Sequence, residues 1–518
     1  MTLQKKLLIA SVYFVQGVVS ITGLAEFILT RNAFHFTWVQ LAFLGALSTL
    51  TWSVKPLYGF LTDGVSIFGL RRKPYLVFSS LLALIGYWSM AFWGTGFTSI
   101  AMGSLTISIG LGFADVIIDG LVVENSTPET VGKWQALCWR SKGWGILLAS
   151  LLSGLLLERA FFSNWLGHST LTNVFSHLFH NTFTVEYVGK ISMLDIRYLL
   201  FFTGLWPLLT LGLTLLVSET KNLTPQPLNL PPKIISTAAL AFVITVILVF
   251  ANVGQALTSL GMVLIWGAWI LGYLRALVKT KIATTTLLFG ALFLFLWRFT
   301  PSFGAPWSDY YINTLHLSQE KLGLIGALSS VSWILGTWLY NRFLDHFPLH
   351  QLLKWTVLVG VVLSFSQLSL TSSSLGMSLG AMPIIKYPTA ILLYPIYFVA
   401  YQGHAWTELM TQPGILNLEA ILSFLLEIMF MVSFLPILKL AAEVTPKGVE
   451  ATNFSILASV MNLGLAFGAV SGGWIYTGIE KGYQFGSFHI SGLQLTIIIG
   501  AVTSLLCLPV IPKLKSLK

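Results

Sequence analysis

The chain has 518 residues, of which 55% are hydrophobic and only 9% carry charge. A soluble domain has about a quarter of its residues charged, so the composition excludes a soluble protein and requires a surface that faces the lipid bilayer. The net charge of +10 does not indicate nucleic acid as a partner, because the basic residues are scattered in short loops rather than gathered on one face.

A helix needs about 20 apolar residues to cross a bilayer, and by this measure the chain has about fourteen transmembrane helices. The apolar run after Met1–Lys6 spans about 23 residues, which is too long for the core of a signal peptide. It is therefore expected to stay as the first helix. The predicted helices cover 7–29, 38–61, 75–95, 97–124, 134–158, 196–218, 234–250, 254–278, 284–305, 322–341, 352–371, 417–438, 450–476 and 490–511.

An even number of helices places both termini on the same side of the membrane. If that side is the cytoplasm, most of the 29 Lys and Arg residues fall in segments on it, as the positive-inside rule requires. No Arg- and Ser-rich transit peptide precedes the first helix. We therefore expect an integral protein of a bacterial inner (cell) membrane with both termini cytoplasmic.

Two segments are longer than the other loops. Residues 159–195 form a predicted outer loop whose histidines have no Cys or carboxylate between them, so no metal site is predicted there. Residues 372–416 are apolar but interrupted by prolines, and we interpret them as an outer loop packed partly on the bundle. A further span over 383–401 would break the charge pattern downstream.

An internal repeat is the most informative feature of the sequence. The motif Gly-Ala-Leu-Ser followed by Trp occurs in 45–52 and again in 326–333. The preceding segments 30–35 and 311–316 share Asn and His at the same places. A Thr-Pro motif with a following Val also recurs after the fourth helix of each half. Two parallel repeats of six helices, related by an axis along the membrane normal, describe the major facilitator fold.

The repeat predicts three parts. Residues 1–220 form an N-terminal six-helix bundle, residues 221–282 a central linker with two extra transmembrane helices, and residues 283–518 a C-terminal six-helix bundle. The predicted fold class is therefore an all-α polytopic membrane protein with the major facilitator fold, and the predicted function is secondary transport. The extra helix pair is assigned no chemistry.

Ionisable side chains inside the membrane cost at least ~2.5 kcal/mol each, so they face a cavity or a partner. The fourth predicted helix carries Asp115 and Asp119, one turn apart on the same face. Two carboxylates this close suit proton binding. Alternatively, Lys55 on the second helix, at a similar depth, neutralises the pair.

In the second half, Arg298 and Glu427 lie on the helices equivalent to the first and fourth, which line the cavity in this architecture. Arg298 is predicted to bind an anionic group of the substrate, because guanidinium holds carboxylates with paired hydrogen bonds. The alternative is a salt bridge with Glu427. Trp297 is a candidate to stack on a flat ring. Weaker candidates for polar side chains that face the cavity are Gln16, Glu26, Asp309 and Asn462.

The loop after the second helix has Gly59, then Asp63, and then a Gly followed by basic residues. Asp63, Arg71 and Arg72 are therefore candidates for a cytoplasmic gate that pairs across the two halves. The alternative is that the basic residues only fix the orientation in the membrane.

Four segments together resemble the folate–biopterin transporter family, a branch of the major facilitator superfamily. These segments are 54–75, 114–124, 299–304 and 445–452 with Asn462. The resemblance implies import of folates, pterins or, in some members, S-adenosylmethionine, with protons as the coupling ion and no cofactor. The extra helix pair and the long outer loops depart from the family pattern and leave the exact substrate open.

The chemistry of the candidate residues fits such substrates. The N–H groups of a pterin ring can donate to Asp115 or Glu427, and the glutamate tail of a folate offers carboxylates to Arg298 or Lys55. S-adenosylmethionine is cationic and would rely more on the acidic residues.

Two other functions stay open. One is a facilitator for another amphiphilic nutrient, and the other is a membrane-embedded enzyme, for example an acyltransferase that uses His346 or His404. Neither histidine lies in a deep helix with an evident polar partner, so no catalytic residue is predicted. The expected mechanism is alternating access by rocking of the halves, with Asp115, Asp119 or Glu427 binding the proton.

Overall fold

The computed structural model describes residues 2–124, 131–179, 183, 186–219, 236–237, 240–241, 243–245, 247–248, 255–279, 285–301, 303–344, 347–443, 450–486 and 488–514. The predicted helix 234–250 lies mostly outside these residues, as do both copies of the Thr-Pro motif.

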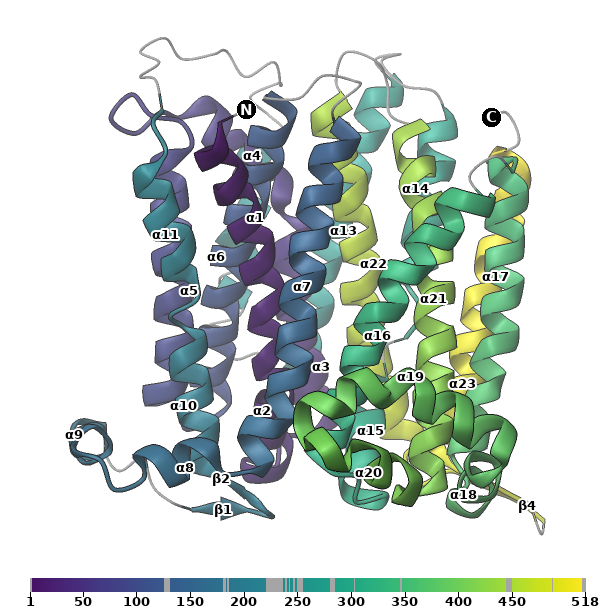
Figure 1. Cartoon of the computed structure of the whole chain (residues 1–518). Helices are drawn as coiled ribbons and strands as arrows, with labels where there is room; N and C mark the ends of the chain where they lie inside the picture. The colour runs from purple at the N-terminus through teal and green to yellow at the C-terminus, as the bar shows by residue number, and fades with distance from the viewer. Residues whose placement is uncertain are drawn as a thin grey trace.

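The described residues form a bundle of helices that run side by side, and the two ends of the chain lie at the same end of the bundle (Figure 1). We call this end the terminal face and the opposite end the far face. Ten described helical segments are long and apolar enough to cross a membrane. The predicted all-α membrane fold is thereby confirmed, whereas the count of fourteen helices and the layout of the repeat stay predictions.

The N-terminal half contains α1 (Leu3–Val18), η1 (Val19–Thr22), α2 (Gly23–Phe27), η2 (Ile28–Ala33), α3 (Trp38–Ser53), α4 (Lys55–Gly64), α5 (Lys73–Trp93), α6 (Phe97–Glu124), α7 (Val131–Glu158), α8 (Phe161–Leu166), α9 (Thr170–Leu178), β1 (Tyr187–Val188), β2 (Ile191–Ser192), α10 (Met193–Thr203) and α11 (Pro207–Leu216).

The linker contributes α13 (Gln255–Lys279). The C-terminal half contains α14 (Thr285–Arg298), α15 (Gly304–Asp309), η3 (Tyr310–Thr314), α16 (Gln319–Leu339), η4 (Tyr340–Leu344), α17 (Leu349–Ser366), η5 (Gln367–Leu370), α18 (Ser373–Ala381), α19 (Pro383–Tyr401), η6 (Gln402–His404), α20 (Ala405–Thr411), α21 (Gly414–Glu443), α22 (Glu450–Ile479), β3 (Tyr483–Phe485), β4 (Phe488–Ile490), α23 (Gly492–Ser504) and η7 (Leu505–Leu514).

Both segments that we interpreted as outer loops contain helices. Residues 372–416 form α18, α19 and α20 at the far face (Figure 1), with Pro388 and Pro395 inside α19. A proline removes one helical hydrogen bond, but membrane helices tolerate it where neighbouring groups satisfy the backbone. Residues 159–195 likewise form α8, α9 and an antiparallel hairpin of β1 and β2.

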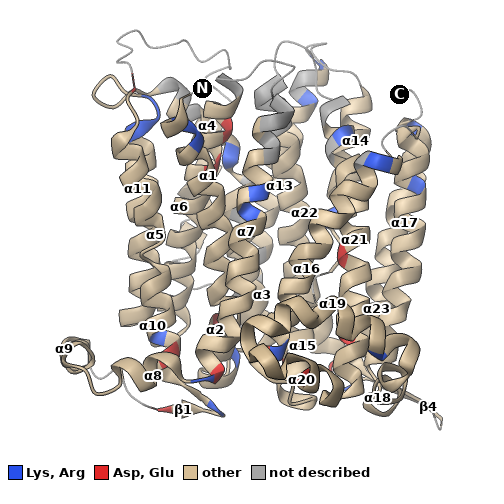
Figure 2. Ribbon diagram, in the orientation of Figure 1, with Lys and Arg blue, Asp and Glu red and all other residues tan. Residues whose placement is uncertain are grey.

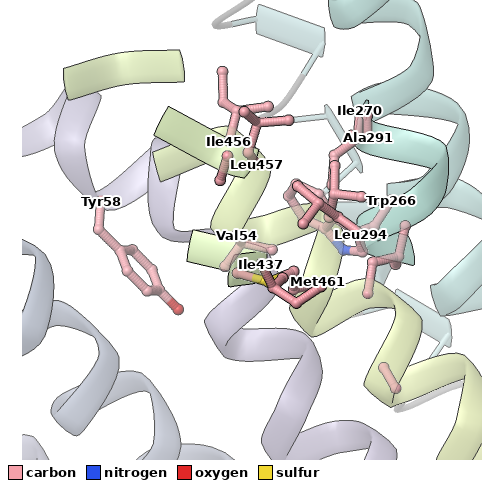
Figure 3. Packing of buried hydrophobic residues seen from close by; sticks show 14 of the residues in the cluster. Val54, Tyr58, Trp266, Ile270, Ala291, Leu294, Ile437, Ile456, Leu457 and Met461 are labelled. Atoms are coloured by element: carbon pink, nitrogen blue, oxygen red, sulfur yellow. The ribbon is translucent and has the colours of Figure 1, made fainter. Parts of the chain in front are cut away.

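The linker helix α13 belongs to the core. Trp266 and Ile270 of α13 are buried in one cluster with Leu294 of α14 and Met461 of α22. Figure 3 shows these side chains together, with Val54 of the N-terminal half nearby. The linker therefore covers the contact between the halves instead of lying apart from the bundle.

The two halves meet along two pairs of helices, α3 with α22 and α7 with α16. Glycines allow the second pair to approach closely. A Cβ atom on Gly154 of α7 would lie 2.1 Å from the carbonyl oxygen of Gln319, and one on Gly323 of α16 would lie 2.7 Å from that of Ser150. Small residues at such contacts let membrane helices pack backbone to backbone.

Polar contacts close the far face between the halves. Arg31 Nε donates to Asp309 Oδ1 at 3.3 Å, and Arg159 Nη2 donates to Glu320 Oε1 at 2.8 Å. Glu158 accepts from the backbone N–H of Glu320 at 2.8 Å. Figure 2 shows most charged residues at the two ends of the bundle and few at middle depth.

The first helix of each half ends in the same way. Segments η2 and η3 are both π-helical turns, and each is followed by a histidine with positive φ, 52° at His35 and 50° at His316. The Nδ2 of Asn32 lies 3.4 Å from the Oδ1 of Asn313, and the reverse contact is 3.2 Å. These features match the positions aligned in the predicted repeat.

Replacing Gly154 with Leu tests the close contact of α7 and α16. Because there is no room for a side chain at this site, we expect the far face to open. Trp165 and Ile384 are 64% and 80% exposed, so spin labels can be attached at Trp165→Cys and Ile384→Cys in a variant without other cysteines. Electron paramagnetic resonance should then measure a longer distance between the two labels. Gly212→Leu has open space and serves as the control, and an unchanged distance in the Gly154 variant would contradict the prediction.

Candidate functional site

A break between α3 and α4 positions Lys55. Helix α3 ends at Ser53, and Val54 departs from helical geometry with φ −94° and ψ 11°. Pro56 has no backbone N–H and therefore fits the first turn of a new helix better than the interior of a long one. At the start of α4, Lys55 forms an ion pair with Asp115 of α6.

Asp115 and Asp119 have different partners. Asp115 is 4% exposed and also accepts from Gln16 Nε2 at 2.8 Å. Asp119 accepts from the hydroxyl group of Tyr13 at 2.6 Å. A cation therefore compensates the first carboxylate, as the alternative interpretation predicted, whereas the second carboxylate is hydrogen-bonded to a neutral group.

Glycines bring α7 against α1 at the same level. A Cβ atom on Gly17 would lie 2.2 Å from the carbonyl oxygen of Lys142, and one on Gly145 would lie 2.3 Å from the backbone of α1. This packing places Lys142 beside the helix that carries Tyr13 and Gln16. The close approach leaves no space for a lipid or a side chain between the two helices.

Lys142 extends the site beyond the predicted residues, together with Trp139 and Trp333. Its Nζ lies 5.9 Å from the centre of the Trp52 ring and 5.5 Å from that of Trp139. Lys55 Nζ lies 4.9 Å from the Trp52 ring. Trp139 also contacts Trp333 of the C-terminal half, and the centres of the two rings are 6.2 Å apart. The sequence signal for Lys142 was available, because this residue falls well inside a predicted helix.

The C-terminal half contributes Arg298 and a stack of rings. The guanidinium carbon of Arg298 lies 5.6 Å from the centre of the Trp297 ring and 6.0 Å from that of Phe430. Trp297 stacks on both Phe430 and Phe434, with centres 6.0 and 6.1 Å away. Phe434 also contacts Trp139 of the other half at 6.1 Å. A series of aromatic ring contacts thus runs from Lys142 in the N-terminal half to Arg298 in the C-terminal half.

No hydrogen bond or ion pair joins Arg298 to Glu427 in the described part of the chain. Within that part, neither side chain has a salt bridge or a side-chain hydrogen bond to another residue. The salt-bridge alternative is therefore not found. Asn462, one of the weaker candidates, donates instead to the carbonyl oxygen of Trp52 at 3.0 Å and so joins the two halves.

Asp63 lies near the end of α4, whereas Arg71 and Arg72 lie in the loop before α5, which is held to the segment after α11. Glu219 accepts from the backbone N–H groups of Arg71 and Arg72 at 2.8 and 2.9 Å. Arg72 Nη1 also donates to Thr62 at 3.1 Å. The side chain of Asp63 lies outside the described residues. These contacts belong to the N-terminal half, and the gate across the halves stays a prediction.

Two helical halves with buried charges and aromatic rings between them define a membrane transporter of the major facilitator type. Solved structures support this fold. A peptide transporter of the POT family matches with a TM-score of 0.60 and 13% sequence identity, over 99% of this chain and 95% of that chain.

The chain belongs to the BT1 family, whose sequence profile matches residues 16–374 and 420–516. A curated relative is the folate–biopterin transporter of Synechocystis sp., which is 27% identical over 510 residues, 97% of this chain and 80% of that protein. Folate transporter 2 of Plasmodium falciparum is 29% identical over 146 residues, 28% of this chain and 32% of that protein. The resemblance predicted from the motifs is confirmed, and the chain is a transporter rather than an enzyme.

Removing one partner of the Lys55–Asp115 ion pair should destabilise the protein more than removing both. Asp115→Asn leaves Lys55 buried without its ion-pair partner, and breaking a buried ion pair costs about 3–5 kcal/mol. We expect a lower melting temperature in detergent, with most of the loss recovered when Lys55→Met is added. Arg31→Gln with Asp309→Asn, a pair whose side chains are each 25% exposed, should cost only about 0–1 kcal/mol. A double variant no more stable than Asp115→Asn alone would contradict the expected coupling.

Proposed function

We propose that this protein imports folates or related pterins in symport with protons, by alternating access across a bacterial inner membrane, with both termini in the cytoplasm. The names of the two curated relatives, a folate–biopterin transporter and a folate transporter, support the substrate class. The observation that carries the proposal is Arg298, a guanidinium set among aromatic rings with no carboxylate partner in the described part of the chain. Such a cation is costly inside a membrane, and an anionic substrate compensates it.

The ring stack and the cations match the two ends of a folate. A pterin is flat and presents a large face, which Trp297, Trp139 or Phe434 can cover by offset stacking. The glutamate tail offers carboxylates to Arg298 and Lys142. Asp115 is already occupied by Lys55 and Gln16, so Glu427 is the better acceptor for the N–H groups of the ring.

Alternating access agrees with the arrangement of the halves. The far face is closed by ion pairs and by backbone contact of α7 with α16, so a substrate would reach the site from the terminal face. Rocking of the halves about the site would break the far-face contacts and open the other route. Asp63, Arg71 and Arg72 would then close the terminal face.

Asp119 is the better of the two helix α6 carboxylates for proton coupling. Asp115 is compensated by Lys55, whereas Asp119 is held by the hydroxyl group of Tyr13. A carboxylate near both a cation pair and the substrate site can take up a proton and change the charge balance there. Glu427, which has no described ion pair, is the second candidate.

S-adenosylmethionine is the alternative substrate. Its sulfonium cation suits a site of tryptophans and a carboxylate, and Glu427, three positions before Phe430 on α21, would supply that carboxylate. Another amphiphilic nutrient is a further option, because stacking and charge pairing do not select one ring system.

Uptake assays test the proposed function directly. Cells that express the chain should accumulate labelled folate, and a proton uncoupler should reduce that accumulation to the level of cells without the protein. Uptake of labelled S-adenosylmethionine instead would favour the alternative substrate, and uptake of neither would refute both.

Arg298→Ala should weaken the binding of folate, which has a glutamate tail, more than the binding of biopterin, which has none. Loss of one charged hydrogen-bonding contact costs about 1.5–3 kcal/mol, so the affinity for folate should fall about 10- to 100-fold. Biopterin has no glutamate tail, and its affinity should change little. Competition against labelled folate measures both, with Arg298→Lys as the matched control, and equal losses for the two ligands would contradict a tail-binding role.

Asp119→Asn should remove the response of transport to a pH gradient. The substituted side chain keeps its size and a hydrogen bond to Tyr13 but cannot bind the coupling proton. In vesicles with an imposed pH difference, accumulation of folate should fall to its equilibrium level. An unchanged pH-driven accumulation would assign proton binding to another residue, with Glu427→Gln the next variant to measure.

A further inference from the structure

A polar cavity lies within the N-terminal half, apart from the ring stack. It has a volume of about 240 Å³ and is lined by residues of α1, η1, α2, α3, α5 and α6. Its lining includes Glu26, Gln16 and the hydroxyl groups of four serines and one threonine. At roughly 30 Å³ per molecule in the liquid, several water molecules fit, and the hydroxyl groups supply the partners that buried water needs.

Glu26 is a carboxylate of α2 at this cavity. The hydroxyl group of Thr22 donates to its Oε1 at 2.6 Å. Tyr87 of α5 lies close enough to interact with both Glu26 and Thr22. In the described structure no cation is paired with Glu26, so it differs from Asp115.

The charged groups on the elements packed against α2 have other partners. Arg31 on η2 pairs with Asp309. On α10, Arg197 donates to backbone carbonyl groups at the end of α5, and Asp195 accepts from the backbone of Phe162. At the end of α7, Glu158 accepts from Ser318 of the C-terminal half. Among the described residues that line the cavity, Glu26 is the acidic one.

Gln16 connects the cavity to the ion-pair cluster. It lines the cavity, and its Nε2 donates to Asp115 at 2.8 Å. Its Oε1 is buried and has no hydrogen-bond partner in the described structure. A buried amide oxygen without a partner is costly, and water in the cavity would satisfy it.

We propose that Glu26 and this cavity form the proton pathway of the N-terminal half, in which Glu26 takes up a proton from the far side and water carries it to the Asp115–Asp119 cluster. The proposal rests on the proton coupling in the proposed function and specifies the route that the proton takes. Only O–H bonds change: the proton leaves the Glu26 carboxyl group for water, and the last water protonates a carboxylate of the cluster. Gln16 and Glu26 are ten positions apart, roughly 15 Å along a helix, so water must bridge them.

The test uses purified protein in lipid vesicles and Glu26→Gln. Two measurements separate the steps: exchange of labelled for unlabelled folate, which moves no net protons, and accumulation driven by a pH difference of one unit. Exchange should persist, whereas accumulation, which is limited to about tenfold for one proton per substrate, should fall to onefold. Glu26→Asp keeps an acid and should retain accumulation, and Glu186→Gln, on the far-face hairpin outside the cavity, is the control.

Ser108→Leu adds an independent test because it fills the cavity and leaves every titratable group in place. It should also lose pH-driven accumulation while exchange continues. Normal accumulation in both Glu26→Gln and Ser108→Leu would overturn the pathway and leave the proposed function intact. Absence of folate exchange in the unmodified protein would instead refute the proposed function, and the pathway with it.

Discussion

The arrangement of this transporter depends on the cost of placing ionisable groups inside a membrane. Only 9% of the residues are charged, and each one at middle depth needs compensation. Lys55 and Asp115 compensate one another. Arg298 and Glu427 have no such partner in the described structure, and in the proposed function this difference separates groups that hold the site together from groups that bind the substrate. Aromatic rings from both halves contact the cations.

The proposed alternating access requires that the contacts between the halves be reversible. Backbone contact at Gly154 and Gly323 is close, and the ion pairs around it lie at the far face. The partly exposed Arg31–Asp309 pair contributes little net stability, so it can break without a large penalty. The site itself uses contacts that cross the halves through rings, such as Trp139 with Trp333, which can slide over one another.

The membrane class and the family were predictable from the sequence, because hydropathy and the motifs leave strong signals. The same signals select Arg298, Asp115 and Lys55 as candidate site residues, and their roles stay predictions. Lys142 was missed because it was counted with the loop charges, although it lies eleven positions inside α7. The helices in 372–416 were missed because prolines were treated as helix breakers. The contact of Arg298 with Phe430 could not be predicted, since it joins residues far apart in the chain.

Asn32 and Asn313 each approach the other's side-chain oxygen through their own amide nitrogen. A contact in which both sides supply the same residue in the same role is the signature of an isologous interface, as found where two identical subunits meet on a two-fold axis. A single six-helix chain that met a copy of itself would make this contact without any change. The asparagine pair thus has, inside one polypeptide, the reciprocal geometry of a contact between two identical subunits.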